Sequence, residues 1–212
     1  MLSEWLPFRD LYISEILGQE QPPTDSLCPK CKSEEGLLQC KDCFSRDLLC
    51  ENCCLTVHRN SPFHSVEKWT GRFFQPTLLN EDRFTLHLGH GGTPCPKAQA
   101  SAESGDVPTE NARRCLTVVD VSGVRQLYFE WCQCDGAPEA GVQLLRSQLF
   151  PASVSKPSTA FTFRVLDYFR IDSVECKTSA LSFFSKLRRL TNNSSPDSVP
   201  VSSNILPFDG II

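Results

Sequence analysis

The chain has 212 residues, of which 12 are Cys and 4 are His, and its formal net charge is −4. No apolar run approaches the roughly 18 residues of a membrane-spanning helix. The N-terminal sequence also lacks the basic and apolar regions of a secretory signal. A cysteine excess without secretion stays reduced, which favours metal ligation over a disulfide framework. The composition therefore predicts an intracellular metal-binding protein and excludes membrane proteins, secreted scaffolds and basic nucleic-acid binders.

The N-terminal part, residues 1–24, predicts a helix and a linker. Residues 3–19 have the apolar spacing of a short amphipathic helix, with Pro7 in its first turn and Gly18 as its stop. The sequence QPPTD at 21–25 is typical of a linker.

Eight candidate metal ligands follow as four pairs. They are Cys28 and Cys31, Cys40 and Cys43, Cys50 and Cys53, and His58 and His64. A C-x2-C pair forms a tight turn that points two thiolates at one cation, so four pairs supply two closed structural sites. Free buried cysteines and disulfides are the alternatives, and the two histidines argue against disulfides. The pairs can be used in sequence or interleaved, and short connections favour interleaving.

The pattern CPKC…CKDC…LLCENCCLTVHRNSPFH resembles the B-box and ZZ-type zinc fingers. The resemblance implies a cross-brace over residues 25–70, with the first and third pairs on one zinc and the second pair and both histidines on the other. Site one is then Cys28, Cys31, Cys50 and Cys53, and site two is Cys40, Cys43, His58 and His64. Cys54 could replace Cys53 but is expected to be a buried neighbour. A RING finger fits worse, because two cysteines occupy its central Cys-His-Cys positions, so ubiquitin ligase activity is not supported.

Beyond residue 70 the apolar pattern changes. Residues 83–90 alternate as a half-buried strand does, and residues 115–132 predict a hairpin turning at Ser122-Gly123. The segment from residue 91 to about 108 is rich in Pro, Gly, Ala and Ser and predicts a mobile loop.

Residues 141–190 predict helices. The last helix has Thr178 or Ser179 as N-cap, and its apolar residues at spacing three are Leu181, Phe184, Leu187 and Leu190. The predicted fold class is α+β: a small zinc-stabilised finger, then a mixed domain over 71–192 with an antiparallel sheet and C-terminal helices. Residues 193–212 predict a disordered tail.

A third group of candidate ligands lies at two predicted strand ends. His90 and Cys95 follow the strand 83–90, and Cys132 and Cys134 follow the hairpin. Adjacent strands ending at one edge would bring them together as a site of three thiolates and one imidazole. Gly89, Gly91 and Gly92 would permit the sharp turns that such a site needs. An unmetallated buried cluster is the alternative.

Three further side chains have simpler interpretations. His87 alternates with the apolar residues of the predicted strand and so lies on its opposite face. It is expected to be exposed and not to be a metal ligand. Cys115 and Cys176 lie in apolar stretches and are expected to behave as small hydrophobic residues.

The order of features over residues 4–192 resembles the cysteine-cluster region, of C-x-C type, that precedes the catalytic domain of fungal KDZ transposases. The matching blocks are WLPFRDLYISEILGQE, the finger, FHSVEKWTGRFF, FTLHLGHGGTPCP, VVDVSGVRQLYFEWCQC, QLLRSQLFPAS, PSTAFTFRVLDYF and SFFSKLRRLT. LGHGGTPCP and WCQC are recurrent blocks of the family, which supports the third site. The family's acidic catalytic domain follows this region, whereas this chain stops at Ile212. We therefore expect a truncated relic, a short gene model or a stand-alone accessory product.

The leading functional hypothesis is a non-enzymatic zinc-binding recognition module of a KDZ transposase-like protein, with two zinc ions in the finger and a third in the cluster. Its partner would be DNA, such as a transposon end, or a protein. The resemblance implies a fungal source and a nuclear location, and we expect no small-molecule substrate. The alternative is a B-box/ZZ-like protein-interaction module without a nucleic-acid role. A Cys-His enzyme using His87 or His90 is disfavoured, because the same residues are explained as ligands.

Charge does not favour DNA. Metal-loaded thiolate sites make the chain more acidic, and only residues 156–190 are mainly basic. Lys186, Arg188 and Arg189 could contact phosphate, although a solvated helix end is the simpler interpretation. The sequence leaves the partner, the oligomeric state and the identity of the thiophilic metal open, with zinc as the default for such ligands.

Overall fold

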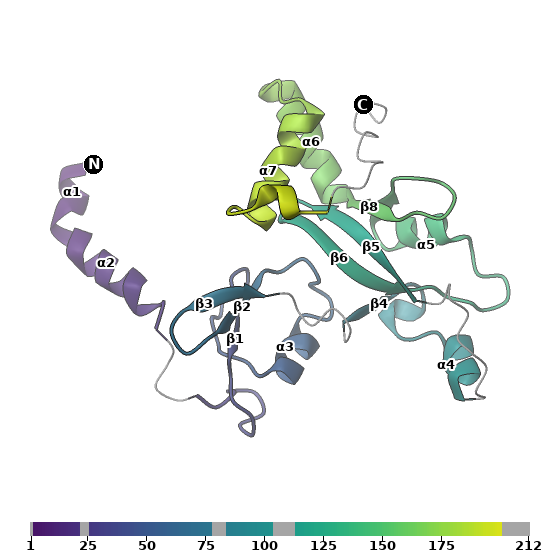
Figure 1. Cartoon of the computed structure of the whole chain (residues 1–212), viewed down its shortest axis with the longest axis horizontal. Coiled ribbons are helices and arrows are strands. Elements are labelled where there is room, and N and C mark those ends of the chain that lie inside the picture. The colour runs from purple at the N-terminus through teal and green to yellow at the C-terminus, as the bar shows by residue number, and fades with distance from the viewer. Residues whose placement is uncertain (1, 22–25, 78–83, 104–112, 201–212) are drawn as a thin grey trace. The chain divides into compact units, whose positions relative to one another are not determined.

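A computed structural model describes residues 2–21, 26–77, 84–103 and 113–200 (Figure 1). The chain divides into two compact units, Met1–Leu79 and Asn80–Ile212. The boundary expected between residues 70 and 71 falls between strands β2 and β3, which pair with each other in the first unit. In the described part of the chain, no helix combines the length and apolar character needed to cross a membrane.

The first unit begins with the predicted helix, which is interrupted. It comprises α1 (Leu2–Trp5), the 3-10 turn η1 (Leu6–Phe8) and α2 (Arg9–Gly18). Pro7 lies in the 3-10 turn and has no N–H to continue the α-helical hydrogen bonds, which explains the break. Helix α2 has no buried residue, so its apolar side chains lie at the surface of the unit.

The rest of the first unit is a small sheet with one helix. Strands β1 (Leu38–Cys40), β2 (Val66–Trp69) and β3 (Phe74–Thr77) are antiparallel in the order β1-β2-β3, and α3 spans Glu51–Val57. The buried cluster beside this sheet consists of Cys28, Leu38, Leu49, Cys50, Cys54 and Val66. Half of these six residues are cysteines, so the apolar core of this unit is very small.

The second unit is built on a five-stranded mixed sheet. Its strands are β4 (Thr85–His87), β5 (Arg113–Asp120), β6 (Gly123–Glu130), β7 (Leu149–Pro151) and β8 (Thr159–Thr162), in the order β4-β6-β5-β8-β7. The predicted hairpin is confirmed as the antiparallel pair β5–β6, and the predicted strand at 83–90 as β4. The sheet is not purely antiparallel, because β4 pairs parallel with β6 and β5 parallel with β8.

The helices of this unit differ in part from the prediction. They are α4 (Pro96–Glu103), α5 (Ala140–Arg146), α6 (Phe163–Glu175) and α7 (Ala180–Thr191), with 3-10 turns η2 (His90–Gly92) and η3 (Pro196–Ser198). The expected mobile loop after residue 91 contains α4 instead, with Pro96 at a first-turn position where its missing N–H costs nothing. Residues 104–108 of that loop lie outside the described residues. The expected run of helices over 141–190 is interrupted by strands β7 and β8.

Helix α7 has the predicted N-cap but a different buried face. The hydroxyl of Ser179 accepts a hydrogen bond from the Ser182 N–H. Leu181 and Leu190 are 78% and 60% exposed, and the residues that α7 buries are Phe183, Phe184 and Leu187. A strict spacing of three drifts by about 60° per step on a helix of 3.6 residues per turn, so it cannot keep to one face.

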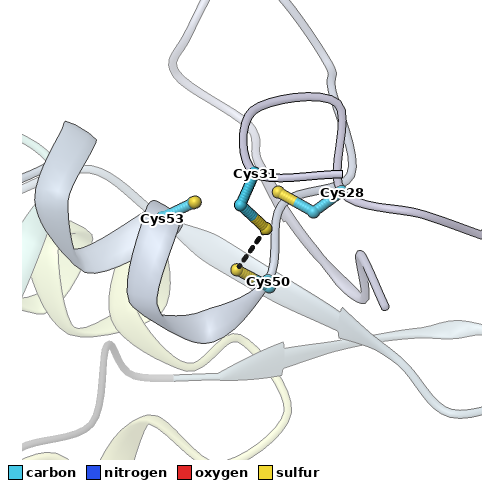
Figure 2. Close-up of side chains that lie close together, drawn as sticks. All are labelled: Cys28, Cys31, Cys50 and Cys53. Atoms are coloured by element: carbon cyan, nitrogen blue, oxygen red, sulfur yellow. Dashed lines mark hydrogen bonds between the residues drawn. The ribbon is translucent and has the colours of Figure 1, made fainter. Parts of the chain in front are cut away.

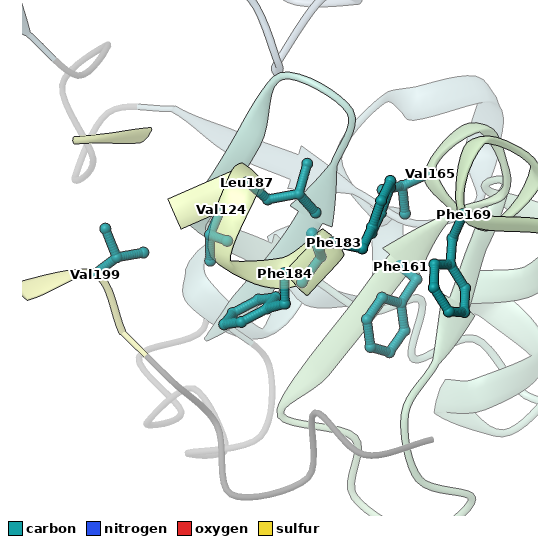
Figure 3. Packing of buried hydrophobic residues seen from close by; sticks show 9 residues of the cluster. Val124, Phe161, Val165, Phe169, Phe183, Phe184, Leu187 and Val199 are labelled. Atoms are coloured by element: carbon teal, nitrogen blue, oxygen red, sulfur yellow. The ribbon is translucent and has the colours of Figure 1, made fainter. Parts of the chain in front are cut away.

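The main apolar core lies where α6 and α7 meet the sheet (Figure 3). Its buried residues are Val119, Val124, Phe161, Val165, Phe169, Phe183, Phe184, Leu187 and Val199. Val199 and η3 belong to the segment expected to be disordered, but residues 193–200 continue the packing of α7, while residues 201–212 lie outside the described residues. This core is independent of the cysteines.

Candidate metal centres

Site one joins a turn to the start of a helix. Cys28 and Cys31 lie in the turn before β1, and Cys50 and Cys53 lie at the N-cap and in the first turn of α3 (Figure 2). The four Sγ atoms all lie within 4.8 Å of one another, and those of Cys31 and Cys50 are 3.8 Å apart. This is the set of four that the resemblance to B-box and ZZ-type fingers implies.

Site two brings together the second C-x2-C pair and both histidines. His58 Nε2 lies 3.4 Å from Cys43 Sγ, and His64 Nδ1 lies 3.4 Å from the Sγ atoms of both Cys40 and Cys43. His58 is 1% exposed, and its Nδ1–H donates to the Cys54 carbonyl over 2.9 Å. That hydrogen bond fixes the tautomer, so the lone pair on Nε2 faces the thiols, as in metal-binding histidines.

Site three forms at one edge of the five-stranded sheet. Because β4 and β6 are parallel, the segments that follow His87 and Glu130 leave the sheet at the same edge. Gly89 has φ +92°, and a Cβ there would lie 3.2 Å from the Cys132 Cβ, so only glycine permits this close approach without strain. The segments that follow β4 and β6 therefore lie next to each other, as expected from adjacent strands that end at one edge.

Four donor atoms converge at that edge: His90 Nε2 and the Sγ atoms of Cys95, Cys132 and Cys134. His90 Nε2 lies 3.2 Å from the first C-x-C sulfur, Cys132, and 3.5 Å from the second, Cys134. The Cys95 and Cys134 sulfurs are 3.7 Å apart, and the Gln133 N–H donates to the Cys95 sulfur. The sequence-predicted set of twelve side chains is thus brought together as three groups of four.

Donor spacing tests whether these groups fit zinc. With Zn–S near 2.3 Å and Zn–N near 2.0–2.1 Å, a tetrahedron separates two sulfurs by about 3.8 Å and a sulfur from a nitrogen by about 3.5 Å. The groups show sulfur–sulfur distances of 3.7 and 3.8 Å and sulfur–nitrogen distances of 3.2 to 3.5 Å. Among the described residues, no Asp or Glu joins any of these groups. The thiolate and imidazole donors and their spacing fit closed zinc coordination.

Hydrogen bonds lower the pKa of some of the candidate ligand thiols. The hydroxyl and N–H of Ser33, with the N–H of Glu34, lower the pKa of the Cys31 thiol to about 6. Burial raises the pKa of Cys95, but hydrogen bonds led by the Gln133 N–H outweigh it and lower that pKa to about 6. These donors stabilise thiolate, the form that binds metal.

Other thiols in the same groups are shifted upward. Burial, followed by the neighbouring Cys40, raises the pKa of Cys43 to about 11. The thiols of Cys95 and Cys132 raise the pKa of Cys134 to about 11. Several adjacent thiolates repel one another, and a divalent cation at their centre removes that penalty, so metal binding would release protons.

The remaining cysteines and His87 lie outside the three groups. All twelve cysteines fall in described parts of the chain, and none of them forms a disulfide. Cys54 is fully buried beside site two, with its sulfur 3.6 Å from His58 Nδ1, and Cys53 rather than Cys54 is placed in site one. His87 was expected to be exposed, but it is half-buried, and its Nδ1 lies 2.5 Å from a Glu130 carboxylate oxygen.

Two predictions about lone cysteines are wrong. Cys115 and Cys176 are exposed, not buried as small hydrophobic residues. Cys115 occupies the outer part of β5, beyond the core that begins with Leu116 and Val118, and Cys176 is the C-cap of α6. An apolar neighbourhood in sequence does not fix the side of a strand or the end of a helix that a residue occupies.

The basic end of α7 is largely paired within the chain. Lys186 Nζ lies 2.5 Å from the carboxylate of Asp172, and Arg188 Nη2 lies 2.6 Å from that of Asp197. Arg189 is exposed. A phosphate would therefore compete with two carboxylates for two of the three predicted contacts.

Comparisons with known proteins give one finding. No curated protein and no solved structure matches the chain. A family model described as "CxC2 like cysteine cluster associated with KDZ transposases" matches residues 79–195, more than half of the chain and the whole of site three. The resemblance drawn from the sequence blocks is thus confirmed over residues 79–195, and the family is an accessory cysteine cluster rather than a catalytic domain. The chain belongs to the CxC2-like cysteine-cluster family associated with KDZ transposases.

Proposed function

We propose that the chain is a non-enzymatic, zinc-stabilised recognition module of a KDZ transposase-like protein, acting in the nucleus. The observation that carries the proposal is the set of three four-donor groups, each closed by cysteine and histidine alone. A zinc ion with four protein ligands has no position for water or substrate, so it stabilises a fold instead of performing chemistry. Sites one, two and three would each hold one ion.

The module's task would be to present a folded surface to a macromolecule, either transposon DNA or a protein. DNA binding would be weak and salt-sensitive, because the chain is acidic and the α7 basic residues are mostly paired. Arg189 would then be the most available contact for phosphate.

One observation favours protein binding instead. The α1–α2 segment exposes large apolar side chains, including Trp5 (60%), Leu11 (55%), Ile16 (60%) and Leu17 (61%). An apolar helical surface of this kind is typical of segments that dock on another protein. A protein-interaction module without a nucleic-acid role is therefore the second candidate function.

Two measurements test the proposal. Native mass spectrometry of the purified chain should show three zinc ions, and a chain that folds without any would contradict the zinc-stabilised module.

Fluorescence anisotropy with transposon-end DNA should show an affinity that falls steeply with salt and that Arg189→Glu weakens. The exposed Lys177→Glu is the matched control for a general loss of charge. No DNA binding at low salt would favour the protein-interaction function, and salt-independent DNA binding would contradict the phosphate contacts.

Activity provides a separate test. Incubation with transposon-end DNA and Mg²⁺ or Mn²⁺ should give no strand cleavage or transfer, because such chemistry needs metal ions held by carboxylates. The described residues contain no group of three carboxylates close enough to share an ion. Cleavage that survives replacement of the zinc ligands would reveal an active site outside these groups.

A further inference from the structure

Gln143 is a buried polar residue, and two of its three side-chain hydrogen bonds go to Cys132 in the C-x-C segment of site three. It lies in α5 and is 6% exposed. Its Oε1 accepts the Cys132 N–H over 2.9 Å, and its Nε2 donates to the Cys132 carbonyl over 3.1 Å. The same Nε2 donates to the Pro138 carbonyl over 2.8 Å. One side chain therefore binds both main-chain polar groups of a predicted metal ligand.

The amide of Gln143 acts as a substitute for a strand. The last main-chain bond between β4 and β6 joins the Leu88 N–H to the Glu130 carbonyl, so Cys132 lies beyond the paired part of the sheet. A carboxamide offers the same donor and acceptor as a peptide group. By binding the N–H and C=O of Cys132, it provides strand-like pairing two residues beyond Glu130.

Cys132 is held from the other side by the loop after β4. The Cα of Gly89 approaches so closely that an added Cβ would lie 3.2 Å from the Cys132 Cβ. The neighbouring residue, His90, places Nε2 3.2 Å from the Cys132 sulfur. Helix α5 is itself anchored by Leu144, which is fully buried. The Cys132 residue is thus contacted both by a side chain of α5 and by a glycine that permits close approach.

We propose that Gln143 is the positioning residue of site three, which orients Cys132 for the metal ion before the ion binds. The inference rests on the proposed function, since it requires a zinc ion at site three. Partners that orient metal ligands typically contribute 10–100-fold to metal affinity. Replacing Gln143 should therefore weaken the third zinc ion by about 10–100-fold. Sites one and two lie in the other unit and should keep their affinities.

The experiment titrates the zinc-loaded full chain with a chromophoric zinc chelator and counts the ions lost at each chelator concentration. Gln143→Met keeps the volume but removes every hydrogen bond, and Gln143→Glu keeps the acceptor but removes both donors. Gln126→Met, at an exposed position of β6, is the matched control. We expect three tightly bound ions in the wild type and the control. Both Gln143 variants should release one ion at a 10–100-fold lower chelator concentration.

Each other outcome would overturn the inference. Three equally tight ions in both Gln143 variants would show that the amide does not position Cys132, and equal weakening of all three ions would show a general loss of stability. A wild-type chain that binds only two ions would instead remove the proposed function at site three.

A second measurement does not depend on how the variants fold. In the metal-free wild type, the Cys132 amide should exchange with deuterium slowly, because its bond to Gln143 needs no metal. Rapid exchange at Cys132 while the β5–β6 amides stay protected would contradict the proposed positioning role.

Discussion

The two units of this chain hold themselves together in different ways. The first has a buried cluster of six residues, three of which are cysteines, around a three-stranded sheet. The second has a core of nine buried apolar residues, four of them phenylalanines, between helices and a five-stranded sheet. In the first unit the candidate metal ligands take the place of most of an apolar core, whereas in the second they lie at one edge of a sheet that has an apolar core of its own. Metal binding would therefore stabilise the whole fold of the first unit but only the loops around site three in the second.

Metal removal should show the largest difference in folding between the two units. A small domain with so little apolar burial cannot offset its chain entropy without its metal ions. With a strong chelator, residues 28–66 should lose their amide dispersion in a heteronuclear NMR spectrum. The signals of β5, β6 and β8 should persist, and added zinc should restore the rest. A spectrum of the first unit that does not change would contradict the zinc dependence.

Single cysteine replacements test which thiols in the first unit are ligands. Cys31→Ser should empty site one and leave two zinc ions per chain by native mass spectrometry, because a hydroxyl is a poor zinc ligand. Cys54→Ser should keep three ions, since the Cys54 thiol is a core side chain outside the groups. Equal metal loss from both variants would mean that Cys54, and not Cys53, is the fourth ligand of site one.

The core of the second unit predicts the opposite behaviour, a large effect on stability without a change in metal content. Phe161 is fully buried in β8, and Phe161→Ala should cost about 3–5 kcal/mol of unfolding free energy in urea denaturation. The zinc content of sites one and two should not change. Leu181→Ala, at a side chain 78% exposed on α7, should change stability by less than about 0.5 kcal/mol. Comparable losses from both variants would contradict the buried face of α7 seen in the structure.

The sequence predicted the metal-ligand groups better than it predicted the sheet of the second unit. The ligand pairs of the first unit could be predicted because C-x2-C spacing is local, and their division into two sites followed from the resemblance to B-box and ZZ-type fingers. Site three could be predicted because the ends of adjacent strands meet at one edge of a sheet. Strands β7 and β8 could not, since Thr159–Thr162 is buried throughout and pairs in parallel with β5, some forty residues away along the chain. Short apolar runs of this kind cannot be told from helix by periodicity.

The contribution of Gln143 was equally hidden. Its side chain reaches Cys132 only after α5 has docked on the sheet, and nothing in the sequence GVQLL marks that position. Residues that act through tertiary contacts leave no local pattern, unlike the ligands themselves.

A smaller loss of stability than that of Phe161→Ala is expected for the removal of a buried charge in the second unit. The carboxylate of Asp120 is buried at the end of β5, where it accepts hydrogen bonds from the Thr162 hydroxyl and from Arg164 Nη2, each over 2.8 Å. It also accepts the N–H and the hydroxyl of Ser122. Burial raises the pKa of Asp120, but these donors together outweigh it and hold the pKa below its usual value. Asp120→Asn should therefore cost about 1–3 kcal/mol at pH 7, because it leaves donors without a charged acceptor.

The pH dependence gives this last prediction its sign. A carboxyl group whose folded pKa is depressed contributes stability that is fully present above the unfolded pKa of about 3.9 and is lost as the pH falls through the folded value. The stability difference between wild type and Asp120→Asn should thus be constant near neutrality and shrink below about pH 4. Zinc release in acid affects both proteins alike and cancels in the difference. Asp167→Asn, at an exposed position of α6 where the carboxylate lies 3.8 Å from Arg170 Nη2, is the control and should show neither effect. A wild-type advantage that grows toward low pH would show that the burial of Asp120 outweighs its hydrogen bonds.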